Sequence, residues 1–255
     1  MLSPITAADI DEAAVRIADF AQVTPLEYSD RLSTATGAEV YLKREDLQSV
    51  RSYKLRGAYN LLQQLSEDEL RVGVVCSSAG NHAQGFALAC RTMKVHGRVY
   101  VPAKTPKQKR DRIRYHGGEF IEVIVGGSTY DDAAEAAITD VARTGATLVP
   151  PYDDPRTMAG QGTIAVEILE QLGREPDLVV VPVGGGGCIS GITTYLAERT
   201  TSTSVLGVEP AGAASMIAAL AEGHPVDLPH VDQFVDGAAV KRAGALTFQA
   251  LSSAG

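Results

Sequence analysis

Short apolar runs alternate along the chain with longer segments in which apolar residues recur at helical spacing. The runs are rich in valine and isoleucine, which favour extended backbone, and they predict strands at 72–76, 97–101, 120–125, 147–149, 178–183 and 205–208. The longer segments predict helices at 82–93, 106–115, 128–137, 162–172, 189–198 and 213–221. Such alternation is typical of an α/β fold, in which right-handed crossovers place helices on both faces of mostly parallel sheets.

Three local features refine this picture. We expect Thr105 to cap the second of these helices, with Pro106 at its first position, and Ser128 to open the third. The run at 178–183 is apolar throughout, which predicts a strand buried on both faces. The segment P-P-Y-D-D-P at 150–155 interrupts the alternation and divides it into two runs. Two lobes with a ligand between them are therefore expected.

Charge and composition narrow the possible partners. The chain has 31 acidic and 23 basic residues and a formal charge of −8, which disfavours nucleic-acid binding and favours a small-molecule partner. Cys76, Cys90 and Cys188 are odd in number and lack metal-ligand spacing, so we expect neither disulfides nor a metal site. No apolar run approaches the roughly 20 residues that span a bilayer, and no secretory signal pattern begins the chain. A cytoplasmic protein without membrane contact is expected.

Four consecutive glycines, Gly184, Gly185, Gly186 and Gly187, follow the apolar strand at 178–183 and precede a predicted helix. Their backbone N–H groups, together with the helix N-terminus, can hold a phosphate dianion. A tight turn is the simpler alternative, but it needs only one or two glycines, and each glycine costs roughly 1 kcal/mol relative to alanine. A dinucleotide fingerprint fails because its third glycine is replaced by Ile189 or Ser190. Glu209, at the end of the next strand, keeps a nucleotide site open as a minority alternative.

A second loop, S-S-A-G-N-H at 77–82, also lies between a predicted strand and helix. Hydroxyls, an unhindered backbone and an amide at a helix N-terminus suit the carboxylate of an amino acid, although a well-capped turn would have the same composition. His82 has no second histidine or carboxylate at ligand spacing, so we expect it to make a structural hydrogen bond.

Lys54 lies just after Ser52, which is well placed to cap a helix at 53–65. A lysine in a first turn meets the positive end of the helix dipole, and burial there would further disfavour the ammonium form. The free amine is the form that makes imines and removes protons. A helix lysine taken alone is more often a solvated surface residue.

Six motifs occur together and in order: K-R-E-D-L-Q (43–48), S-Y-K-L-R-G-A-Y-N (52–60), S-S-A-G-N-H-A-Q-G (77–85), G-Q-G-T-I-A-V-E (160–167), V-G-G-G-G (183–187) and V-E-P-A-G (208–212). With T-P-L at 24–26 before them and D-G-A-A-V at 236–240 after them, they belong to a match that covers nearly the whole chain. In this combination the chain resembles pyridoxal-phosphate enzymes of the tryptophan-synthase-β type, and within that group it is most similar to the biosynthetic threonine dehydratase family.

The resemblance implies a fold type II architecture with pyridoxal 5'-phosphate in the cleft between two lobes. It implies a larger cofactor-binding lobe of residues 1–66 and 147–255 and a smaller substrate-gripping lobe of residues 67–146. Lys54 would hold the cofactor through an imine and later take the Cα proton of the substrate. Asn81 would form a hydrogen bond to the ring hydroxyl of the cofactor, and the four glycines would bind its phosphate. The substrate carboxylate would be gripped by Ser78, Ala79, Gly80 and Asn81.

The implied activity is the dehydration and deamination of L-threonine to 2-oxobutanoate and ammonia in isoleucine biosynthesis, by a homodimer or homotetramer. Alternatives on the same scaffold are serine dehydration, serine racemisation and β-replacement at cysteine; a non-catalytic binding domain is the alternative from another class. The family's catalytic domain normally continues beyond this chain with a hydroxyl for the pyridine nitrogen, and we expect that segment and the regulatory domain to be absent. The acid that some relatives use for a divalent cation is replaced after Glu209 by Ala213, Ala214 and Ser215, so no cation is expected there.

Overall fold

A computed structural model describes residues 3–253 of the chain. The helices and strands, in chain order, are α1 (Ala7–Ile17), β1 (Leu26–Tyr28), α2 (Asp30–Thr36), β2 (Tyr41–Lys43), η1 (Glu45–Leu47), α3 (Lys54–Leu62), α4 (Glu67–Val72), β3 (Val74–Ser77), α5 (Asn81–Met93), β4 (Gly97–Val101), α6 (Lys107–Gly117), η2 (Gly118–Phe120), β5 (Ile121–Val125), α7 (Tyr130–Thr144), β6 (Thr147–Leu148), α8 (Pro155–Leu172), β7 (Leu178–Pro182), α9 (Gly187–Arg199), β8 (Ser204–Val208), η3 (Ala211–Ala213), α10 (Ser215–Glu222), η4 (Asp236–Ala238) and α11 (Ala245–Ser253). All six predicted strands are present, with boundaries shifted by at most two residues. The predicted α/β class is confirmed.

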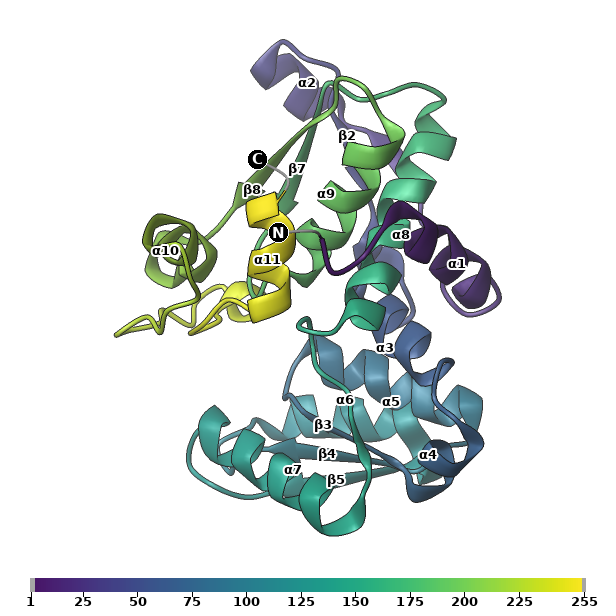
Figure 1. Ribbon diagram of the computed structural model, residues 1–255, viewed down its shortest axis with the longest axis vertical. Helices are drawn as coiled ribbons and strands as arrows, with labels where there is room; N and C mark the ends of the chain where they lie inside the picture. Colours follow the sequence, from purple (N-terminus) through teal and green to yellow (C-terminus); the bar gives the residue numbers. More distant parts are fainter. Residues whose placement is uncertain (1–2, 254–255) are drawn as a thin grey trace.

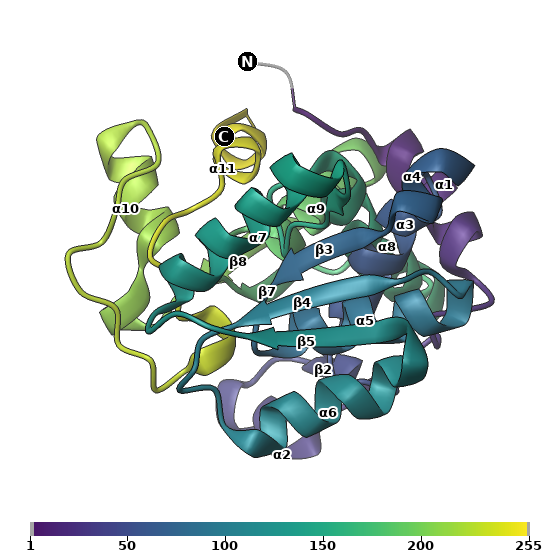
Figure 2. The same ribbon diagram turned by 90° about the horizontal axis from the view of Figure 1, so that it is seen from below.

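A four-stranded parallel sheet with the order β5-β4-β3-β6 organises one half of the molecule. Helices α5 and α6 pack on one face of this sheet and α7 packs on the other (Figure 2). Successive side chains of β3 point to opposite faces of the sheet. Val74 and Cys76 therefore belong to the core under α5, whereas Val75 belongs to the cluster under α7. At the carboxyl end of β3, a Cβ atom added to Gly80 would lie 3.9 Å from the Asp236 Oδ2, so the loop at 78–81 lies next to a residue of the other half of the chain.

The other half contains β7 and β8, which pair in parallel, and helices α8, α9, α10 and α11 (Figure 1). The expectation that the strand at 178–183 is buried on both faces is wrong. Val181 is buried, but Leu178 and Val180 are 51% and 57% exposed. The physical reason is that the described residues cover only one face of this two-stranded sheet, so alternate side chains face solvent.

Helix α3 lies between the two halves and contacts both α5 and α8 (Figure 1). Ala58, Leu61 and Leu62 of this helix belong to the core beneath the four-stranded sheet, and a separate core surrounds α8 and α9. The lobe boundaries at 66/67 and 146/147 stay a prediction, because α3 is shared between the two cores. Within residues 3–253 no helix is both long enough and apolar enough to cross a membrane.

Several predicted helix starts are wrong by one to a few residues. Tyr53, not Ser52, is the N-cap of α3, and the buried hydroxyl of Ser52 has no hydrogen-bond partner among the described residues. Pro106 rather than Thr105 occupies the N-cap of α6. Thr129 rather than Ser128 caps α7, because its hydroxyl and the Asp132 carboxylate form a reciprocal capping box.

The largest change concerns α8, which was expected at 162–172. Asp154 accepts a hydrogen bond from the backbone N–H of Arg156, and Pro155 occupies the first helical position. The helix therefore begins at Pro155, within the segment that marked a break in the sequence pattern. Gly160 and Gly162 consequently lie inside a helix, where they allow close helix packing.

Candidate active site

Lys54 is the first residue of α3, and its side chain is half-buried. Its Nζ atom donates a hydrogen bond of 2.8 Å to the carbonyl oxygen of Pro151. Burial lowers the pKa of Lys54 to about 8 from 10.5. The amine is thus far more available in neutral form than that of a solvated lysine.

Tyr152 connects this amine to the four glycines, which we call the tetraglycine loop (184–187). Tyr152 follows Pro151, and a Cβ atom added to Gly185 would lie 2.4 Å from its ring. A Cβ atom added to Gly187 would lie 2.9 Å from the Tyr152 Cβ. Cys188, which follows the loop, is close enough to Lys54 for each to affect the other's pKa. The fold therefore brings Lys54 and the tetraglycine loop together, although they are about 130 residues apart in the sequence.

The tetraglycine loop connects β7 to the N-terminus of α9. Gly186 is the N-cap, with φ at 96°, a conformation that glycine adopts readily, and no side chain caps the helix there. A Cβ at Gly186 would lie 2.5 Å from the Met216 Cε and 2.8 Å from the Thr247 Oγ1. The first N–H groups of an α-helix lack intrahelical partners, so this uncapped N-terminus offers donors to an anion. These features fit the phosphate of pyridoxal phosphate, and the crowding also explains why several glycines occur together.

The loop from Ser78 to Asn81 leads from β3 into α5. Ser78, Ala79 and Gly80 are half-buried and Asn81 is exposed, so a ligand can reach them. The backbone N–H of Gly80 donates to the Ser78 Oγ at 3.2 Å. One turn further on, a Cβ at Gly85 would lie 2.7 Å from the backbone nitrogen of Leu55, so α5 packs directly on the start of α3. This packing places the loop beside Lys54.

His82 makes the structural hydrogen bond that was expected. Its Nε2 atom lies 2.9 Å from the carbonyl oxygen of Val149. Burial, and then the positive charge of Lys54, lower the pKa of His82 to about 3. The ring is consequently neutral at physiological pH, and its role is to hold the first turn of α5.

Sequence reasoning missed the residues that support the tetraglycine loop from behind. The Thr247 hydroxyl donates to the carbonyl oxygen of Gly185 at 2.7 Å. The Asp153 carboxylate accepts hydrogen bonds from the backbone N–H groups of Ala245, Leu246 and Thr247 and so caps α11. The sequence pattern at 150–155 predicts only a break between two runs. Tyr152 and Asp153 are the aromatic and acidic residues within it that could have indicated a supporting role.

The Glu209 carboxylate is occupied by backbone hydrogen bonds and is not free to bind a ribose. It accepts hydrogen bonds from the backbone N–H groups of Met216 and Ile217, at 2.9 and 2.8 Å. It therefore caps the first turn of α10, and the minority nucleotide alternative loses its acid. Across residues 3–253 no group of three or more histidine, cysteine, aspartate or glutamate side chains is arranged to hold a metal ion.

Comparison with known proteins identifies one family. The profile described as "Pyridoxal-phosphate dependent enzyme" matches residues 17–255. The chain is 78% identical over 254 residues to "L-threonine dehydratase biosynthetic IlvA" of Mycobacterium tuberculosis, covering 100% of this chain and 59% of that protein. It is 47% identical to the protein of the same name from Bacillus subtilis, covering 98% of this chain and 60% of that one. The chain thus spans about three fifths of the length of these relatives.

Solved structures agree in fold. Threonine deaminase isoform 2 from Solanum lycopersicum superposes with a TM-score of 0.89 at 43% identity, over 95% of this chain and 71% of that one. Serine racemase from Dictyostelium discoideum also gives a TM-score of 0.89, at 31% identity, over 98% of this chain and 78% of that one.

Proposed function

The chain belongs to the family of pyridoxal-phosphate dependent enzymes, and on that premise we propose that it acts as a threonine dehydratase, converting L-threonine to 2-oxobutanoate and ammonia. One observation carries the proposal: the half-buried amine of Lys54, with its lowered pKa, lies beside the tetraglycine loop. A surface lysine would not combine these properties. The names of relatives up to 78% identical support threonine as the substrate.

Each part of the site has a proposed task. Backbone N–H groups of the tetraglycine loop would hold the cofactor phosphate at the N-terminus of α9. Asn81 would form a hydrogen bond to the ring hydroxyl of the cofactor, and the loop from Ser78 to Asn81 would hold the substrate carboxylate. When bound, pyridoxal phosphate supplies an electron sink for the substrate Cα.

Lys54 would then act as a base. Its neutral amine takes the proton from the substrate Cα, and the β-hydroxyl leaves as water. Hydrolysis at the Cα–N bond returns one water, so threonine gives 2-oxobutanoate and ammonia in overall balance. The low pKa of Lys54 serves this step, because a base must be unprotonated at the moment it takes the Cα proton.

Serine dehydration or racemisation is the second candidate. The serine racemase structures at 31% and 30% identity support it, because they share the fold over nearly the whole chain. Threonine and serine differ by one methyl group, which is worth only about 1 to 3 kcal/mol in a pocket. Assays of keto-acid release and of D-serine formation, each with a single substrate, separate the two candidates.

The wider setting is also a proposal. We place the reaction in isoleucine biosynthesis, in the cytoplasm, and in a homodimer or homotetramer. The term "biosynthetic" in the relatives' names supports the pathway. We further propose that residues 67–146 form the substrate-gripping lobe and that residues 1–66 and 147–255 form the cofactor lobe.

Borohydride reduction tests the site directly. The chain is incubated with pyridoxal phosphate, reduced and digested, and the modified peptide is identified by mass spectrometry. We expect one modified residue, Lys54, and a yellow absorbance band before reduction. The matched control is Lys54→Ala, which should show neither. A colourless protein, or label on another lysine, would overturn the proposal and favour a non-catalytic binder.

A further inference from the structure

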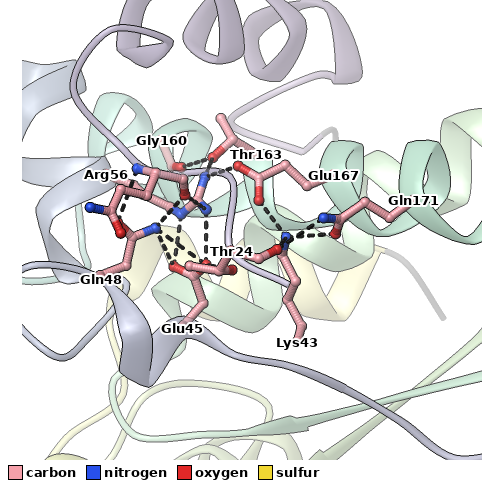
Figure 3. Close-up of polar contacts among 10 residues, drawn as sticks. Thr24, Lys43, Glu45, Gln48, Arg56, Gly160, Thr163, Glu167 and Gln171 are labelled. Carbon is pink, nitrogen blue, oxygen red and sulfur yellow. Dashed lines mark hydrogen bonds and ion pairs between the residues drawn. The ribbon is translucent and has the colours of Figure 1, made fainter. Parts of the chain in front are cut away.

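Four charged side chains form a largely buried group of ion pairs (Figure 3). We call this group, which consists of Lys43, Glu45, Arg56 and Glu167, the charge cluster. Their side chains are 7%, 11%, 0% and 11% exposed, respectively. Two positive and two negative charges make the cluster neutral.

Arg56 is the centre of the charge cluster. Its Nε and Nη2 atoms donate to the two carboxylate oxygens of Glu45, each at 2.8 Å, which is the bidentate geometry that fixes a guanidinium in one orientation. Its Nη1 atom donates to Glu167 at 2.6 Å and to the Thr163 Oγ1 at 3.0 Å. Lys43 binds the other oxygen of Glu167 at 2.5 Å. The cluster thereby joins β2, η1, α3 and α8 (Figure 3).

A buried set of ion pairs is weak evidence for stability, because desolvation offsets most of the attraction. Directional contacts do, however, restrict geometry. Arg56 lies two residues after Lys54 on α3, and its partners Thr163 and Glu167 lie on α8. Glycine packing brings the same two helices close, since a Cβ at Gly160 would lie 2.6 Å from the Gly57 Cα. The helix that carries the amine is thus fixed against the helix that follows Pro151.

The charge cluster also lies near the end of the tetraglycine loop. Burial raises the pKa of the Cys188 thiol to about 12; among the smaller influences, Lys54 lowers it, Glu45 raises it further and Arg56 lowers it. Cys188 directly follows the loop, so the cluster is within electrostatic range of the site.

We propose that the charge cluster is a positioning device, which holds the first turn of α3 so that the Lys54 amine meets the cofactor at the tetraglycine loop. Arg56 and Glu45 are its positioning residues. This inference rests on the proposed function, because it concerns how Lys54 reaches the cofactor.

Two ligands separate positioning from general support of the fold. Pyridoxal phosphate has both a phosphate and an aldehyde for Lys54, whereas pyridoxine 5'-phosphate has the phosphate but no aldehyde. Glu45→Gln replaces the carboxylate that binds the Arg56 guanidinium by an uncharged amide of nearly the same volume. Misplacing a reacting group by about 1 Å costs on the order of 100-fold in rate. We therefore expect Glu45→Gln to slow the capture of pyridoxal phosphate by Lys54 by about tenfold or more and to leave binding of pyridoxine 5'-phosphate unchanged.

Asp140→Asn is the matched control. Asp140 is also a buried carboxylate, 3% exposed, and it pairs with Arg98 and Arg143 to join α7 to β4 rather than to α3. We expect this variant to bind both ligands as the wild type does, even where its unfolding temperature falls. The positioning role would be overturned if Glu45→Gln reduced capture of pyridoxal phosphate and binding of pyridoxine 5'-phosphate by the same factor, or if it reduced neither.

A second variant protects the test against misfolding of the first. Lys43→Met with Glu167→Gln removes one charge of each sign and keeps the Arg56–Glu45 pair. It should selectively slow the capture of pyridoxal phosphate, by a smaller factor than Glu45→Gln does. An unchanged capture rate would overturn the proposal. Borohydride labelling of the wild type is scored first. An unlabelled wild type would refute the proposed function, and this inference with it. A labelled wild type, with charge-cluster variants that capture pyridoxal phosphate as the wild type does, would refute the inference alone.

Discussion

The side-chain nitrogen of Lys54 donates to the carbonyl oxygen of Pro151, 97 residues further along the chain, at 2.8 Å. This bond joins the start of α3 to the segment that precedes α8 and contacts the tetraglycine loop through Tyr152. A carbonyl acceptor orients the amine but carries no full charge to retain its proton. Burial therefore controls the protonation state of Lys54.

The pH dependence of cofactor capture follows from that state. Only the neutral amine attacks an aldehyde, and burial lowers the pKa of Lys54 to about 8. Below that pH we expect the capture rate to rise about tenfold per pH unit, and above it to level off. Stopped-flow absorbance from about pH 6 to pH 9 measures the rate. A rate that keeps rising toward pH 10, as for a lysine in a short peptide, would contradict a lowered pKa.

Lys54→Met is expected to stabilise the cofactor-free chain at neutral pH. Below about pH 8 the amine is charged in both the folded and unfolded states, and burying it opposes folding. Between about 8 and 10.5 the unfolded state binds more protons than the folded one, so wild-type stability rises with pH and the advantage of the variant disappears. Thermal unfolding at both ends of this window is the measurement. The exposed Lys104→Met is the control and should be neutral throughout.

Gly186→Ala should damage the phosphate site as well as the fold. The residue has φ at 96°, and an added Cβ would contact Met216 and Thr247. Gly223→Ala is a matched control, because Gly223 has φ at 76° but open space around its Cβ position. Both substitutions should cost about 1 kcal/mol or more in unfolding free energy through backbone strain. Only Gly186→Ala should weaken binding of pyridoxine 5'-phosphate; equal binding by the two variants would refute a phosphate role for the loop.

Asp153→Ala removes the cap of α11, which carries Thr247 to the tetraglycine loop. We expect a loss of about 1 kcal/mol in unfolding free energy, typical of a lost cap, together with weaker phosphate binding. Ser66→Ala removes the N-cap of α4 and should cost a similar amount without affecting the ligand. Chemical denaturation and ligand titration of both variants provide the comparison. Unaltered phosphate binding in Asp153→Ala would show that α11 does not support the loop.

The sequence by itself determined the α/β class, the six strands and the residues worth testing. Strand and helix periodicity are local properties of the chain, and glycine runs or a lysine near a helix start are visible without a fold. The family resemblance added the roles proposed for Lys54, Asn81 and the glycines.

Local signals failed where two candidates competed or where a long-range contact decided the outcome. Thr129 caps α7 in place of Ser128 because its partner Asp132 completes a capping box. Only the tertiary structure decided that β7 is exposed on one face, since an apolar run does not reveal what covers it. It also decided that Tyr152 and Thr247 support the tetraglycine loop, and that Arg56 is enclosed by Glu45 and Glu167. These contacts join segments far apart in the chain, and such pairing depends on how the helices pack rather than on any spacing in the sequence.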